Sequence, residues 1–92
     1  MPRRSAEGAK AGWMKYVYML RSASYPDRYY VGATIDLKKR LREHNSGQEG
    51  HTKKFVPWEL VGYLAFSDHD KADAFELYLK SASGRAFAKR HF

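Results

Sequence analysis

The fold is decided by residues 30–45, YVGATIDLKKRLREHN. The apolar start predicts the end of a strand, the glycine allows a close approach of backbone or ligand, and the charged remainder predicts a short helix. Leu37 and Leu41 lie four positions apart, so they mark the helix face that packs on the core. Arg40 and His44 border that face. The stretch therefore brings a cation and an imidazole toward the end of a strand.

Arg40 allows two interpretations. The simple one is an arginine at the edge of a surface helix, solvated or held in a salt bridge. The other is a phosphate ligand, because an arginine beside a core face is costly to bury without a partner and phosphate is a natural partner in a basic protein. Lys38 and Lys39 point away from the core face, where water can hydrate them.

The composition predicts one small basic domain. Lys and Arg number 17 against 10 Asp and Glu in 92 residues, which gives a net charge of +7. Such a surface attracts polyanions, most often nucleic acid, although charge alone does not separate this partner from an acidic protein or a membrane surface. The absence of cysteine excludes disulfides, zinc knuckles and thiol catalysis and agrees with a cytoplasmic location. We expect neither a membrane span nor a secretory signal.

The chain divides into an arm and a domain. Residues 1–13 are small, polar and basic, and they predict a flexible arm that has no role or touches a polyanion. Residues 14–92 predict a single domain. Within it, residues 15–20 predict a central strand with apolar side chains on both faces, and residues 29–32 follow closely enough to form an antiparallel hairpin with it. Residues 57–66 predict a third strand, which the proline begins or places at an edge.

Turn and cap residues bound the first helix. Thr34 or Asp36 is expected to cap its start, and Gly47 to supply a left-handed stop. The polar loop that follows contains cations suited to phosphate contact, Lys53 and Lys54, although a solvated loop explains them equally well.

The second helix is expected to begin with a capping box formed by Ser67 and Asp70. Its end is predicted at Ser83-Gly84, and residues 85–92 predict a short basic amphipathic tail. The core stripe would consist of Ala72, Phe75, Leu79 and Ala82.

Glu76 lies at the edge of that stripe, where an inward carboxylate needs a cation. The simple interpretation is a salt bridge to Lys80 or Arg40. The sharper one is a metal ion.

We expect the predicted elements to bring their polar side chains to one place: Tyr18, Tyr30, Arg40, His44 and Glu76. A hard cation such as Mg²⁺ takes a carboxylate and waters and polarises a phosphate. Arginine can neutralise charge that grows on phosphoryl oxygens. A phenol with a pKa of about 10 is a poor base at neutral pH, so a proton-transfer role needs a cation that lowers that pKa. The set is suited to phosphodiester hydrolysis.

Two tyrosine-containing triplets, Tyr16-Val17-Tyr18 and Tyr30-Val31-Gly32, are separated by eleven residues. They resemble the paired signature of the GIY-YIG endonuclease superfamily, with a tyrosine in place of the first glycine. The helix of residues 34–47 is similar to the family's helix, and Glu76 lies at about the family's distance downstream. The segment at residues 57–60 and the Phe75-Glu76 pair most resemble the small stand-alone bacterial branch and the catalytic domain of Slx1-type structure-specific nucleases.

The resemblance, over residues 14–82, implies an α+β fold in which a three-stranded antiparallel sheet is flanked by helices. It implies metal-dependent DNA hydrolysis with a single Mg²⁺ or Mn²⁺. Tyr30 would act as general base or orient the water, and Tyr18 would assist it or contact the phosphate. Arg40 would bind the scissile phosphate, and Glu76 would hold the metal.

Histidines and lysines complete the set of expectations. His44 matches a family histidine near the site and would relay a proton, whereas His51 is a weaker candidate and more typical of a surface residue. We expect backbone contacts to DNA from the cations Arg40, Lys38, Lys39, Lys53 and Lys54.

Departures from the family leave the substrate open. Ala33 stands where some relatives carry a lysine, no Asn or Gln stands at the late position after Glu76 that some members use, and the cysteine-rich zinc domain of Slx1-type proteins is absent. The leading interpretation is a DNA endonuclease of repair or recombination that acts on branched or damaged DNA. The alternatives are a non-catalytic nucleic-acid-binding module and a nuclease subunit that needs a partner protein.

Overall fold

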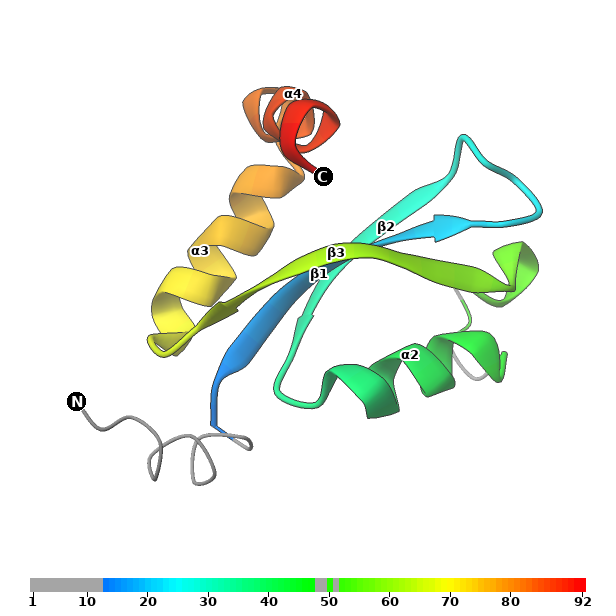
Figure 1. Cartoon of the computed structure of the whole chain (residues 1–92), viewed down its shortest axis with the longest axis horizontal. Helices are drawn as coiled ribbons and strands as arrows, with labels where there is room; N and C mark the ends of the chain where they lie inside the picture. Colours follow the sequence, from blue (N-terminus) through cyan, green and yellow to red (C-terminus); the bar gives the residue numbers. More distant parts are fainter. Residues whose placement is uncertain (1–12, 48–49, 51) are drawn as a thin grey trace.

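The computed structural model describes residues 13–47, 50 and 52–92. The expected arm, apart from its last residue, and His51 lie outside these residues. Among the described residues, no helix has the length and apolar character needed to cross a membrane. The elements run in the order β1 (Lys15–Ser22), β2 (Tyr29–Thr34), α2 (Leu37–Asn45), a 3₁₀ turn (Lys53–Phe55), β3 (Trp58–Phe66), α3 (His69–Leu79) and α4 (Ala82–His91) (Figure 1).

The strands form one three-stranded sheet in the order β2-β1-β3, and both pairings are antiparallel. This confirms the expected hairpin, the central position of β1 and the α+β class. Tyr18 of β1 lies directly opposite Gly32 of β2 and Tyr63 of β3. The register of the hairpin thus places a tyrosine beside a glycine.

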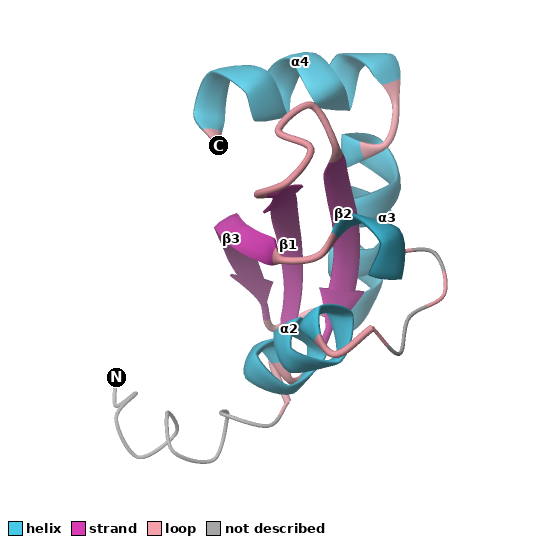
Figure 2. Ribbon diagram, turned by 90° about the vertical axis from the view of Figure 1, so that its right-hand side faces the viewer, coloured by secondary structure: helices cyan, strands magenta, loops and turns pink. Residues whose placement is uncertain are grey.

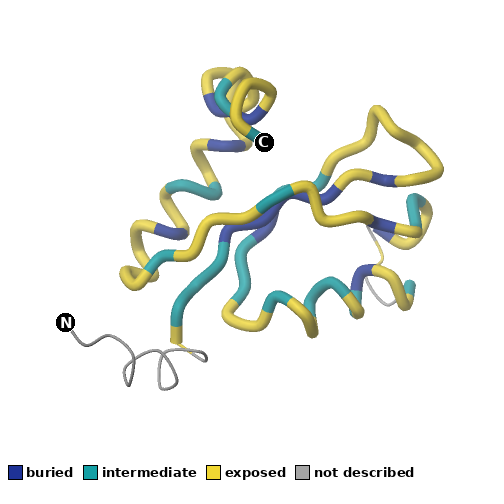
Figure 3. The backbone as a smooth tube through the Cα atoms, in the orientation of Figure 1, coloured by how far each residue is buried: buried dark blue, intermediate teal, exposed yellow. Residues whose placement is uncertain are grey.

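Helices cover both faces of the sheet. Figure 1 shows α2 on one side and α3 with α4 on the other, and the turned view of Figure 2 places α4 and α2 at opposite ends with the strands between them. The period of two along β1 explains this layering, because successive side chains point to opposite faces. Figure 3 shows buried positions concentrated along β1, while β3 is mostly exposed.

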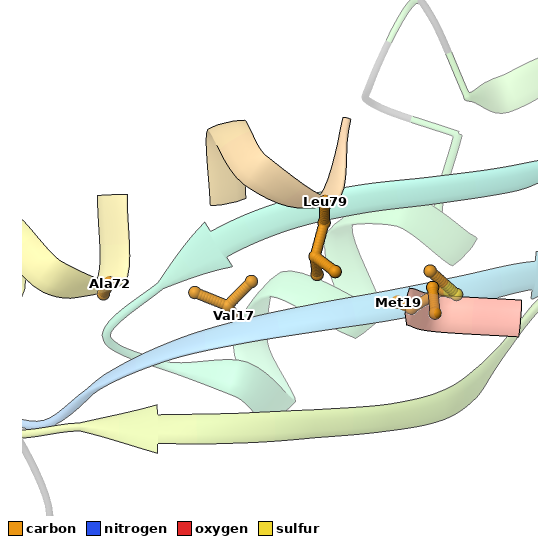
Figure 4. Close-up of a cluster of buried hydrophobic side chains, with 5 residues drawn as sticks. Val17, Met19, Ala72 and Leu79 are labelled. Carbon is orange, nitrogen blue, oxygen red and sulfur yellow. The ribbon is translucent and has the colours of Figure 1, made fainter. Parts of the chain in front are cut away.

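The core on the α3 and α4 side is built around β1. Val17 and Met19 of β1 pack with Ala72 and Leu79 of α3 (Figure 4). Ala88 of α4 completes the buried cluster. The opposite core contains Tyr18, Leu20 and Trp58, against which Leu37 and Leu41 of α2 pack. The expected core face of α2 is therefore correct.

The ends of α2 follow the predicted chemistry. Asp36 is the N-cap, and its carboxylate accepts a hydrogen bond from the Lys39 backbone N–H at 3.1 Å. Thr34 supports the cap, since its hydroxyl accepts from the Asp36 N–H at 3.1 Å. Gly47 lies just beyond the helix with φ of 81°, a left-handed conformation that favours glycine.

The predicted bounds of the second helix are wrong at both ends. Asp68, not Ser67, is the N-cap of α3, and its carboxylate accepts from the N–H groups of Asp70 and Lys71 at 2.9 and 3.2 Å. A carboxylate one position closer to the first turn is the better partner for these donors. The helix ends at Leu79, so Ala82 is not part of its stripe.

Residues 82–91 form a full helix, α4, in place of the expected break and short tail. The Ser81 hydroxyl caps it by accepting from the Gly84 N–H at 3.1 Å. Gly84 therefore lies in the first turn of a helix, and its role is space: a Cβ there would lie 1.7 Å from the Tyr78 carbonyl oxygen and 2.6 Å from the Leu79 Cα. The absent side chain lets α4 begin directly against the end of α3.

We expect Gly84→Ala to lower the free energy of unfolding by about 3 kcal/mol, because the clashing atoms belong to the backbone and cannot swing aside. Chemical denaturation measures this change. Gly50→Ala is the matched control, since nothing lies within 4 Å of its added Cβ. Equal stabilities for the two variants would show that the α3–α4 corner opens at no cost.

Candidate active site

Tyr18 is the centre of the candidate site. Its side chain is 1% exposed although it ends in a hydroxyl. The ring lies over Gly32, and a Cβ at that position would come within 2.5 Å of the Tyr18 hydroxyl oxygen and 2.9 Å of the Tyr30 ring. The glycine of the second triplet is therefore a place of close approach, as its position in the motif predicted.

His44 holds the Tyr18 hydroxyl from α2. The imidazole is fully buried, with Nε2 3.0 Å from the Tyr18 hydroxyl and Nδ1 3.0 Å from the Thr52 hydroxyl. Thr52 is itself buried, and its carbonyl oxygen accepts from the Trp58 indole N–H at 2.9 Å. With both ring nitrogens engaged inside the fold, His44 orients Tyr18.

A pair of backbone-to-side-chain hydrogen bonds fixes this end of α2 to β3. The Asn45 amide donates to the Trp58 carbonyl at 3.1 Å and accepts from the Trp58 N–H at 2.6 Å. Sequence reasoning missed both Asn45 and Thr52. The amide next to the expected histidine was a signal for Asn45, whereas nothing in the local sequence marked Thr52.

Tyr30 lies beside the same imidazole. Its ring centroid is 4.7 Å from that of His44 and 6.3 Å from that of Tyr18. Unlike Tyr18, Tyr30 is only half-buried. Of the two phenols, Tyr30 is the more accessible to an incoming ligand.

Arg40 reaches the cluster from the middle of α2. Its Nη1 donates to a Glu43 carboxylate oxygen at 2.9 Å, and its side chain is 27% exposed. The guanidinium also hydrogen-bonds Tyr18. Arg40 thus contacts the buried phenol and keeps an exposed edge.

Glu76 approaches from α3, on the other side of the sheet. Its carboxylate lies 3.0 Å from the Lys80 ammonium and is 25% exposed. The simple interpretation, a salt bridge to Lys80, is thus present in the structure. Its charge also acts on Tyr18. The link between the two groups is therefore electrostatic, since the carboxylate favours the neutral form of the phenol.

The donor set limits what kind of metal could bind. Among the described residues, no three side chains of the His, Asp or Glu type come together as a metal-binding group. A site with one carboxylate suits Mg²⁺ or Mn²⁺, because Mg²⁺ keeps several waters and takes its other ligands from substrate phosphates. The residues present fit such an ion if Glu76 exchanges Lys80 for it.

Burial raises the pKa of Tyr18 from its usual 10 to about 12. The hydrogen bond and charge of Arg40 oppose the rise, whereas the charges of Tyr30 and Glu76 add to it. A cation that lowers the phenol pKa was the condition for a proton-accepting role, and at Tyr18 burial outweighs it. At neutral pH Tyr18 is a neutral phenol, suited to donate a hydrogen bond.

This pKa makes stability depend on alkaline pH. The unfolded phenol loses its proton near pH 10 and the folded one near pH 12, so the folded state holds more protons between these values. The free energy of unfolding is unaffected below pH 10 and should fall through the window by up to about 3 kcal/mol. Tyr18→Phe should remove this part of the alkaline loss, although it lowers stability at neutral pH because His44 loses a partner.

Denaturation curves at pH values on either side of 10 test this. The control is Tyr29→Phe, at an exposed position, which should keep the wild-type pH dependence. Identical pH profiles for Tyr18→Phe and wild type would contradict the buried neutral phenol.

The lysines expected to contact DNA are all exposed: Lys38, Lys39, Lys53 and Lys54. Lys39 lies 3.9 Å from the Glu43 carboxylate, and the Lys54 ammonium lies 5.7 Å from the centroid of the Phe55 ring. Lys38 and Lys39 lie on α2, and Lys53 and Lys54 lie in the 3₁₀ turn.

Most of the chain is similar to one family of known protein domains. The model of the GIY-YIG catalytic domain matches residues 14–90. A "Structure-specific endonuclease subunit SLX1" of Debaryomyces hansenii is 43% identical over 51 residues, which cover 49% of this chain and 15% of that protein. The SLX1 homolog of Drosophila ananassae is 37% identical over 68 residues, covering 65% of this chain and 23% of that protein. No solved structure matches the chain significantly.

A relative of similar size is a UPF0213 protein of Streptococcus pyogenes serotype M5. It is 35% identical over 72 residues, which cover 77% of this chain and 76% of that protein. By contrast, the chain spans less than a quarter of the two SLX1 proteins. The match to the family model takes in nearly every described residue, and the resemblance seen in the two triplets is confirmed. The chain belongs to the GIY-YIG family, and residues 14–90 form the catalytic domain of that nuclease family.

Proposed function

We propose that this protein is a divalent-metal-dependent endonuclease that hydrolyses phosphodiester bonds in DNA. The observation that carries the proposal is that Tyr18 and Tyr30 meet at Gly32 and that Arg40 and Glu76 both act on Tyr18, in a protein with a net charge of +7. Arg40 has the charge and geometry to hold a phosphate, and it is already oriented by Tyr18 and Glu43. A basic surface draws DNA to the site.

Each side chain has a role in the proposed reaction. Tyr30, the accessible phenol, orients the attacking water or accepts its proton. Tyr18 donates a hydrogen bond to a phosphate oxygen or to Tyr30, since its raised pKa keeps its proton in place. His44 is a positioning residue that acts through Tyr18. Glu76 would hold Mg²⁺ or Mn²⁺, which when bound supplies positive charge beside the phosphate.

We propose backbone recognition by the exposed lysines of α2 and the 3₁₀ turn. These side chains carry no means of reading base edges, and phosphate contacts position a protein without specifying sequence. The SLX1 proteins are named as structure-specific endonuclease subunits. We accordingly propose that DNA structure, more than sequence, selects the substrate, in a role in repair or recombination, and that a protein partner takes part as in those subunits.

Cleavage of labelled branched, nicked and plain duplex DNA tests the function. We expect cuts in Mg²⁺ or Mn²⁺, none with chelator, and a loss of roughly 100-fold in Tyr30→Phe, because removal of a proton-transfer group typically has this effect. Tyr63→Phe is the control, since Tyr63 is an exposed tyrosine on β3. Cutting that persists in chelator, or equal rates in the two variants, would contradict the proposal.

One observation favours a second candidate, a nucleic-acid-binding module without turnover. The Glu76 carboxylate is neutralised by Lys80 at 3.0 Å and in that state needs no metal. Salt-sensitive binding to DNA without cuts under any metal condition would favour this candidate.

A further inference from the structure

A cavity with an apolar floor and several cations lies on the α3 and α4 side of the sheet, away from α2. This cavity, called the groove below, has a volume of about 860 Å³. It lies between α4 and the part of the sheet where β1 ends and β2 and β3 begin. Arg21 and Tyr29 line it from the sheet, Lys80 from the end of α3, and Arg85, Lys89 and Phe92 from the C-terminal helix and its end. Of the five candidate site residues, Tyr30 also lines this cavity.

The side chains that line this groove carry a net positive charge. Arg21, Arg85 and Lys89 are exposed, and within the part of the chain that the structure describes none has a carboxylate at ion-pair distance. Glu59 is the acidic residue among those that line the groove, and it lies directly opposite Arg21 in the sheet, while Lys80 is paired with Glu76. The net positive charge therefore comes mainly from Arg85 and Lys89, and such a surface attracts an anion.

The groove also offers aromatic surface. Tyr29 is 55% exposed beside Arg21, its direct cross-strand neighbour. Phe92 closes the other side, where it packs on Gly62 with 3.3 Å between its ring and the site of a Cβ. Grooves that bind single-stranded nucleic acid combine these features, with cations along the backbone and aromatic rings on which bases stack.

We propose that this groove binds a single-stranded segment of nucleic acid. A bare strand has unpaired bases free to stack on Tyr29, whereas the bases of a duplex are already stacked and paired. Lys80 joins the groove to the candidate active site, since it lines the groove and contacts Glu76. The inference rests on the proposed nuclease function for its consequence: the strand is the unpaired arm of a branched substrate, held while Glu76 and Arg40 act at the junction.

Binding of a labelled oligothymidylate, followed by fluorescence anisotropy with chelator present, tests the groove without cleavage. The double variant Arg85→Gln/Lys89→Gln removes two groove cations. We expect it to bind roughly 20-fold more weakly at about 0.1 M salt and to reduce the slope of log K against log salt by about 1.4, or about 0.7 per lost phosphate contact on a single strand. The control Lys71→Gln/Arg90→Gln removes the same charge from exposed positions outside the groove and should change affinity by less than about 3-fold.

Variants at Tyr29 separate stacking from charge. Tyr29→Ala should weaken binding by roughly 10-fold and Tyr29→Phe should not, because the aromatic face carries the contact. Equal affinities for the two double variants would overturn the inference. So would a poly-glutamate peptide that competes as well as unlabelled oligothymidylate, which would identify an acidic protein as the occupant.

The failures of the two proposals differ. If wild type cuts DNA in a metal-dependent way but the groove and control variants bind the oligonucleotide equally, the groove inference fails and the nuclease stands. If no DNA is cut but the groove variant alone loses affinity, the groove is supported and the nuclease fails.

Discussion

Replacing Glu76 with glutamine is expected to reduce DNA cleavage by roughly 1,000-fold while leaving DNA binding within about 3-fold of wild type. The change removes the carboxylate proposed to hold the divalent ion, and charge stabilisation in such a site contributes several kcal/mol. Binding should be preserved because a carboxylate repels phosphate. Removal of the Glu76 charge also frees Lys80, whose ammonium lies 3.0 Å from the carboxylate, to contact the DNA backbone.

The matched control is Asp73→Asn. Asp73 lies one turn earlier on α3, where its carboxylate pairs with Lys15 at 2.7 Å and is 54% exposed. Rates are measured on one labelled substrate over a range of Mn²⁺ concentrations, and binding is measured in chelator. The metal role would be refuted if Glu76→Gln lost binding and cleavage in equal measure, or if both variants cut at the same rate.

The sheet and its layers could be predicted because they depend on local chemistry. Apolar side chains on both faces of β1 predicted a central strand, and the family resemblance implied the helices that flank the sheet. The sequence offered Thr34 or Asp36 as the cap of α2 and Gly47 as its stop, and the structure has Asp36 and Gly47 in these places. The strand alternation, the helix cap and the helix stop each depend on residues that are close in sequence, so they could be predicted from it.

The corner between α3 and α4 was mispredicted because the cause is tertiary. A glycine after a serine normally ends a helix, yet Gly84 lies inside one because its missing side chain makes room for the Tyr78 carbonyl. A Ser-Gly pair looks the same in sequence whether it ends a helix or lies in the first turn of the next one. The packing of α4 on α3 distinguishes these two cases. The N-cap of α3 was mispredicted by one position, because Ser67 and Asp68 are neighbours in sequence and both residue types are good caps.

At the candidate site, spacing predicted which residues approach one another but not how they are supported. His44 was expected to relay a proton, and the structure encloses both of its ring nitrogens between Tyr18 and Thr52. The distance from Thr52 to Tyr18 in sequence explains why no local pattern showed this. Burial of the Tyr18 ring, which raises its pKa, is likewise a property of the assembled core.

Replacing Arg40 with glutamine is expected to lower the cleavage rate by roughly 100- to 1,000-fold, because removing one donor that faces developing charge typically has this effect. The fall should appear in kcat more than in KM if the guanidinium contacts the phosphate mainly in the transition state. The loss also removes the hydrogen bond and charge that now oppose the rise in the Tyr18 pKa.

Arg42→Gln provides the control on the same helix. Arg42 is exposed, so the two variants lose the same charge but only Arg40 touches the cluster. Arg40→Lys keeps the charge without the planar fork of donors and should recover only part of the lost rate. If Arg40→Gln and Arg42→Gln slowed cleavage equally, Arg40 would be contributing general attraction to DNA, and its place beside Tyr18 would be structural.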